Sequence, residues 1–187
     1  MNRADHFLPE LERLAAEVNV VYDVVVRPGW MGQQHGMPDT LFGYIMCVFA
    51  RIDLYSAHWR GTFGAQSDRM VSFLCEYAHP DRLANSIAVQ IWRHKLMHTS
   101  APRPLSDHTT GTTHLWLLQW GDEHLPREHH FKFQGGNNVL SLSLAGLLAD
   151  FRAAIPKYVG DLTTQADLQT NYDLIEAELK SYELRVI

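Results

Sequence analysis

Hydrophobic residues recur three and four positions apart through the first half of the chain, which is the spacing of amphipathic helices. Residues at this spacing share one face of a helix and can be buried together. The pattern predicts four helices, which we expect at about residues 9–26, 41–58, 68–77 and 81–98. The second of these is apolar on most sides, so we expect it at the centre of a helical bundle.

The spacing changes after the fourth predicted helix, where a short apolar run and then alternating apolar and polar residues follow. Both patterns indicate β-strands. Residues 115–120 form the apolar run, and Phe131 and Phe133 alternate with polar neighbours, so we expect these two segments to pair as a β-hairpin across the polar loop 121–128. The alternating leucines of residues 140–144 predict a third short strand.

Helical spacing returns at residues 143–157, where we expect Pro156 to end or kink the helix because proline lacks the backbone N–H. Thr164 followed by Asp167 resembles a helix N-terminus and predicts one last helix. Together these patterns predict a single domain of mainly α class. We expect an antiparallel helical bundle of four to six helices, with a small β-hairpin or three-stranded sheet inserted after the fourth helix at about 113–144.

The composition narrows the function classes. A formal net charge of −5 argues against a protein coated in positive charge for bulk nucleic-acid binding, although a local basic pocket is compatible with it. The beginning of the chain does not resemble a secretory signal, and the apolar stretch 41–50 is too short to span a bilayer. Cys47 and Cys75 lie in apolar helical patterns, so we expect buried free thiols. These features predict a soluble, cytoplasmic protein with no membrane segment.

The end of the fourth predicted helix, with the sequence IWRHKLMHT, carries the most informative residues. Arg93 is followed directly by the polar residue His94, and His98 comes five positions after the arginine. This arrangement resembles the HEPN superfamily, whose mark is an arginine, four to six further residues and a histidine, often with a polar residue directly after the arginine. The order of elements over residues 41–104, a helical bundle followed by a proline-containing loop, also resembles that superfamily.

The resemblance implies a metal-independent endoribonuclease that uses no cofactor. His98 would exchange a proton with the ribose 2′-hydroxyl or with the leaving oxygen, because a histidine with a pKa near 6.5 exchanges protons at neutral pH. Arg93 would hold the scissile phosphate, and His94 would orient either group or contact the phosphate itself. The resemblance further implies a homodimer whose two motifs face one cleft, an RNA substrate, and a toxin or defence component with an antitoxin or other protein partner.

Helix geometry adds two expectations about these residues. On an ideal α-helix Arg93 and His98 lie about 140° apart, so a second subunit or a frayed helix end would help them to converge. Asp53 is an acid in the apolar second helix and needs a partner if it is buried. We therefore expect Asp53 to pair with Arg93.

Two other interpretations remain open. Arg93 could serve only an ion pair, and His98 could complement the dipole at the helix end, in a non-catalytic helical dimer that binds a protein or a nucleotide. Alternatively, His94 and His98 lie four apart and share a helix face, which is the spacing of helical zinc ligands. With His58 or His79 they would form a three-histidine site in a metal-dependent bundle enzyme.

Overall fold

The computed structural model describes residues 4–26, 39–99, 102–119, 130–134 and 138–181. Helices form most of these segments, and two of the helices contain wider π-helical turns, labelled η1 and η2. The helical elements are α1 (Ala4–Val21), η1 (Tyr22–Val26), α3 (Asp39–Arg60), α4 (Gln66–Tyr77), α5 (Arg82–Ala88), η2 (Val89–Lys95), α6 (Leu96–Thr99), α7 (Leu144–Thr164) and α8 (Ala166–Ser181). The strands are β1 (Leu105–Asp107), β2 (Thr112–Gln119), β3 (Lys132–Gln134) and β4 (Val139–Ser143).

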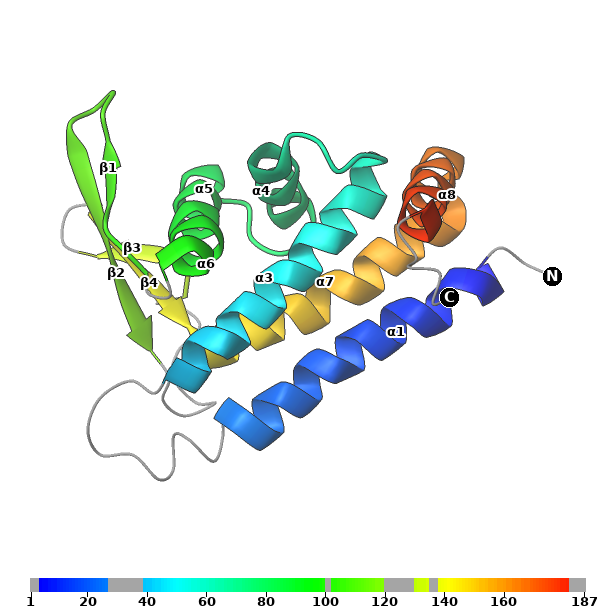
Figure 1. Ribbon diagram of the computed structural model, residues 1–187, viewed down its shortest axis with the longest axis horizontal. Coiled ribbons are helices and arrows are strands. Elements are labelled where there is room, and N and C mark those ends of the chain that lie inside the picture. Colours follow the sequence, from blue (N-terminus) through cyan, green and yellow to red (C-terminus); the bar gives the residue numbers. More distant parts are fainter. Residues whose placement is uncertain (1–3, 27–38, 100–101, 120–129, 135–137, 182–187) are drawn as a thin grey trace.

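Three long helices run side by side along the length of the molecule (Figure 1). Helix α3 lies between α1 and the shorter helices α4 and α5, with α7 packed beside it. Helix α1 runs opposite to α3 and α7, the small sheet lies at one end of this layer, and α8 lies at the other. The class is mainly α, with a small sheet after the fourth helix of the bundle, as predicted.

Helix α3 is the centre of the core because it is apolar on several faces. Tyr44, Val48 and Tyr55 are buried on it, and the two tyrosines face different neighbouring elements. The ring of Tyr44 packs against Tyr22, whereas Tyr55 packs against Tyr158 of α7. Because α3 contacts α1, α4, α7 and α8, a side chain on α3 can reach residues from several helices.

The four strands form one sheet in the order β1-β2-β4-β3. Strand β2 pairs with β4 in parallel, and β3 pairs with the other side of β4 in antiparallel orientation. The predicted hairpin between the runs at 115–120 and 131–133 is therefore wrong, because β4 lies between those two strands. Strands β2, β3 and β4 lie at the three predicted runs, whereas β1 was not predicted. The pattern of apolar residues carries no information about which strand pairs with which. Residues 121–128 lie outside the described part of the chain.

Two predicted helix boundaries are also wrong, both at prolines. Helix α1 begins at Ala4, so Pro9 lies inside it and does not open it. Helix α7 continues through Pro156 to Thr164. Ile155 and Tyr158 on either side of that proline are buried, and their packing offsets the loss of one backbone hydrogen bond.

Three smaller findings complete the comparison with the sequence. Leu83 of α5 is 56% exposed, whereas Ile91 and Trp92 of η2 are buried. Cys47 and Cys75 are free thiols, but each is half-buried, not enclosed in the core. In the segments that the structure describes, every helix is too short or too polar to be a candidate for crossing a membrane.

Candidate functional site

Three helices bring charged side chains together around Asp53 of α3. The carboxylate accepts hydrogen bonds from Arg69 of α4 at Oδ1 and from Arg93 of η2 at Oδ2, the latter at 3.2 Å. Gln66, at the start of α4, donates to Oδ2 as well. The expected ion pair between Asp53 and Arg93 is present, and Arg69 is a second cation that the sequence did not reveal.

The group is positively charged and only partly covered. Arg69 is 3% exposed, whereas Asp53 and Arg93 are 15% and 18% exposed. Burial lowers the pKa of the Arg69 guanidinium, and the carboxylate of Asp53 acts in the opposite direction. An arginine stays protonated near neutral pH even so. Two guanidiniums therefore share one carboxylate within this group, which leaves it with a net positive charge and makes it favourable for an anion.

The helix that carries the motif is not an ideal α-helix at this point. Its residues Val89–Lys95 form a π-helical turn, and the N–H of Leu96 reaches back five positions to the carbonyl of Ile91. Such a turn takes in one additional residue. Residues five apart across it approach the positions that residues four apart occupy in an α-helix. The helix that carries Arg93 is therefore not the ideal helix for which the separation of about 140° between Arg93 and His98 was calculated, and that separation stays a prediction.

The pKa of His94 depends on both of the other motif residues. Burial lowers its pKa, the positive charge of Arg93 and the neighbouring His98 lower it further, and Asp53 acts in the opposite direction. Its Nε2 is hydrogen-bonded to the hydroxyl of Ser67 on α4 at 2.8 Å. At pH 7 the ring is mainly neutral, so one of its nitrogens can donate a hydrogen bond and the other can accept one.

His98 lies at the exposed end of the same helix, in α6. Within the described residues no hydrogen bond joins it to Arg93, and its link to the site runs through the electrostatic contact with His94. An exposed imidazole can meet a ligand from solvent, whereas Arg93 would meet the same ligand at the edge of the buried ion pair. Arg93, His98 and Asp53 therefore all lie close enough to His94 to act on its charge.

The three-histidine metal site is wrong for the part of the chain that the structure describes, where no group of three suitable ligands occurs. His58 is buried at the far end of α3, where its ring bonds the carbonyl of Leu54 and the carboxylate of Glu176. His79 lies near Asp150, and its ring lies against that of Phe131 at an interplanar angle of 57°. Neither histidine is available to complete a site with the motif histidines.

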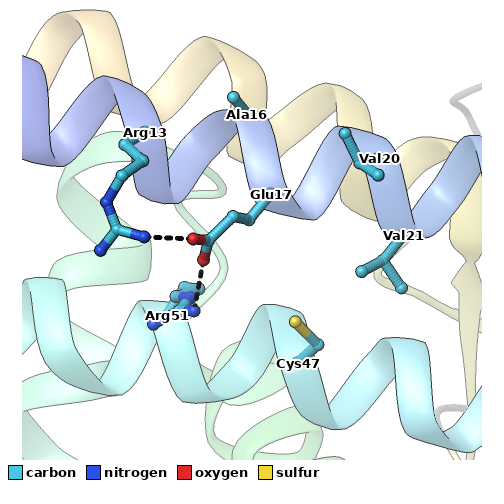
Figure 2. Close-up of a pocket in the computed structure, with 7 residues that line it drawn as sticks. All are labelled: Arg13, Ala16, Glu17, Val20, Val21, Cys47 and Arg51. Atoms are coloured by element: carbon cyan, nitrogen blue, oxygen red, sulfur yellow. Dashed lines mark hydrogen bonds and ion pairs between the residues drawn. The ribbon is translucent and has the colours of Figure 1, made fainter.

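Several hollows among the described residues lie outside the ion-pair group, and two of them are open grooves. A polar groove of about 230 Å³ between α4 and α5 is lined by Ser67 and Arg82, among others, and Ser67 is the residue that bonds His94. A larger and more apolar groove of about 450 Å³ lies between α1 and α3. Figure 2 shows Glu17 at one end of it, bonded to both Arg13 and Arg51. This second groove holds none of the motif residues.

Sequence reasoning did not identify Ser67, Gln66 or Arg69 as residues of the site. A polar residue in the first turn of a short helix usually faces solvent, and nothing local distinguishes these three. Their positions follow from the packing of α4 against α3, which depends on residues far apart in the chain.

Comparison of the chain with protein-family models, with curated proteins and with solved structures gives no match. The resemblance to the HEPN superfamily therefore rests on the motif and on the order of the helices, and it stays a prediction.

Proposed function

We propose that the protein is a HEPN-like, metal-independent endoribonuclease, with Arg93, His94 and His98 in its active site and Asp53 in support. The observation that supports this most is the composition of the ion-pair group, in which one carboxylate serves two guanidiniums beside two histidines. A phosphodiester is an anion that suits such a site. The net charge of the whole chain is negative, so the positive charge is local and suited to one phosphate, not to a long nucleic acid.

The proposed reaction is an attack of the ribose 2′-oxygen on the adjacent phosphorus. His98 takes the proton from the 2′-hydroxyl, the new P–O2′ bond forms, and the P–O5′ bond breaks. The leaving 5′-oxygen takes a proton from a protonated imidazole, which the second copy of His98 in a homodimer supplies. The products are a 2′,3′-cyclic phosphate and a 5′-hydroxyl. Arg93 stabilises the charge that grows on the phosphoryl oxygens, and Asp53 holds its guanidinium in place.

A homodimer follows from this mechanism, because it requires two imidazoles with different protonation at one phosphate. We place the dimer in the cytoplasm, as a toxin or defence component whose activity an antitoxin or other protein partner restrains. The exposed position of His98 supports an interface or substrate contact at this end of the helix.

The test is cleavage of a mixed RNA pool by the purified protein, with and without EDTA. Arg93→Ala and His98→Ala should each abolish cleavage, and EDTA should leave it unchanged. Arg60→Ala and His108→Ala are matched controls, because both residues are exposed and lie outside the site. Both controls should cleave at the wild-type rate, and circular dichroism should show that all four variants are folded. Cleavage that survives both site substitutions would refute the proposal.

A second candidate is a non-catalytic dimer that binds an anionic ligand in the same place. The pairing of Arg93 with Asp53 favours it, since a guanidinium held by a carboxylate can have a purely structural role. A protein that cleaves no RNA, yet binds a nucleotide in calorimetry and loses that binding in Arg93→Ala, would establish this candidate and exclude the ribonuclease.

A further inference from the structure

Ser67 connects the motif helix to α4 through a short chain of hydrogen bonds. Its Oγ lies 2.8 Å from Nε2 of His94 and 3.5 Å from the side-chain nitrogen of Gln90. Gln90 and His94 are both in η2, so the serine bridges two residues of the π-helical turn from the neighbouring helix. The same serine lines the polar groove between α4 and α5.

The positions of the protons follow from what each group can do. The amide nitrogen of Gln90 is a donor, so the serine oxygen accepts on that side. The serine hydroxyl hydrogen is then free to be donated to Nε2 of His94, and Nε2 is the acceptor when it is. A neutral imidazole with an accepting Nε2 carries its proton on Nδ1. In the free amino acid the other tautomer predominates, so the serine reverses the ordinary preference.

The opposite side of the ring is open to a ligand. Nδ1 of His94 has no hydrogen-bond partner among the described residues, and it is not among their fully buried polar atoms without a partner. Burial and the neighbouring Arg93 and His98 lower the pKa of this histidine, which keeps the ring neutral at pH 7. An Nδ1–H group beside Arg93 is a second donor for an oxygen that the guanidinium already attracts.

We propose that Ser67 is a positioning residue that holds His94 in the Nδ1–H tautomer, so that His94 donates a hydrogen bond to a phosphate oxygen of bound RNA. This inference rests on the proposed function for its ligand, but the tautomer itself does not depend on catalysis. The inference assigns different roles to the two motif histidines. His94 binds phosphate as a neutral donor and takes no part in proton transfer, and His98 performs the proton transfer.

The first test is the imidazole ¹⁵N spectrum of the free protein at pH 7.5, with His94 assigned from the signal that disappears in His94→Gln. The wild type should show the Nδ1–H tautomer for His94. Ser67→Ala should shift the signal to the Nε2–H tautomer, and Ser67→Thr, which keeps the hydroxyl, should restore Nδ1–H. Ser72→Ala is the matched control, since Ser72 lies on the same helix and bonds Arg82 instead.

The second test is the kinetics of RNA cleavage by the same variants. Ser67→Ala should raise KM about 3-fold to 10-fold with little change in kcat, as expected for the loss of one hydrogen bond made equally before and during reaction. Ser67→Thr should restore KM. A fall in kcat with KM unchanged would overturn the division of roles.

The two tests separate the inference from the proposed function. A wild-type His94 that is Nε2–H or protonated at pH 7.5 would overturn the inference without any variant, as would a Ser67→Ala spectrum identical to the wild type. A protein that shows the serine-dependent tautomer but cleaves no RNA would refute the ribonuclease and still support the positioning role of Ser67.

Discussion

Replacing Asp53 with asparagine tests how much the ion-pair group contributes to the fold. The substitution keeps the size of the side chain but removes the negative charge that Arg69 and Arg93 share. It also replaces one acceptor oxygen by an NH₂ group, which must then face a donor of Arg69, Arg93 or Gln66. Arg69 is 3% exposed, so its charge would stay buried without a partner carboxylate from Asp53.

Removing one partner of a buried ion pair costs about 3–5 kcal/mol. Because Asp53 and Arg93 are partly hydrated, we expect the lower end of that range, about 3 kcal/mol. For a chain of this size each kcal/mol changes Tm by about 2–4 °C, so Tm should fall by about 6–12 °C.

The chain offers a matched control in Glu17, which also serves two arginines, Arg13 and Arg51 (Figure 2). Glu17 is 39% exposed, and exposed pairs contribute about 0–1 kcal/mol, so Glu17→Gln should cost under about 1 kcal/mol. Urea unfolding of both variants at pH 7, followed by circular dichroism, gives the two free energies. If Asp53→Asn costs no more than Glu17→Gln, burial does not decide the strength of these ion pairs and the reasoning is refuted.

Two further predictions concern the stability of the fold. Gly61 has a φ of +71°, and a Cβ there would lie 2.6 Å from Oδ1 of Asn171, so Gly61→Ala should cost about 1–3 kcal/mol in urea unfolding. Gly43→Ala, in helix α3 with nothing within 4 Å of the new Cβ, should instead stabilise by about 0.5–1 kcal/mol, and a loss there would contradict the assignment of open space. The pKa of His94 is lowered in the folded protein, so this histidine takes up a proton near pH 6.5 in the unfolded chain but only at a lower pH in the folded chain. The contribution of neutral His94 to the stability of the fold is therefore present above pH 6.5 and is lost as the pH falls below it. Tm measured from pH 7.5 to 5.5 should accordingly fall less in His94→Gln than in the wild type.

The helices could be predicted from the sequence because their apolar residues repeat at a period that no other element has. A partner for Asp53 could also be predicted, because an acid in an apolar helix needs one. Arg93 is the partner that was expected. Arg69 could not be predicted, because it becomes buried only when α4 packs against α3.

The π-helical turn in the motif helix could not be predicted from the sequence either. Residues Val89–Lys95 carry no local sequence signal for a π-helical turn, and helical periodicity looks almost the same with or without it. The turn nevertheless includes Arg93 and His94, so the backbone at two residues of the candidate site has a form that only the structure shows. The roles of the motif residues stay predictions that the proposed experiments test.

The parallel pairing of β2 with β4 has a consequence for the order in which the chain can fold during synthesis. Strand β2 ends at Gln119, but β4 begins at Val139, so the ribosome must add the intervening segment and then β4 before β2 gains this neighbour. Until then β2 is paired on one edge alone, through β1, and Leu115 and Leu117 emerge beside an open row of backbone donors and acceptors. During this interval the nascent chain exposes an unpaired strand edge, at which aggregation can begin.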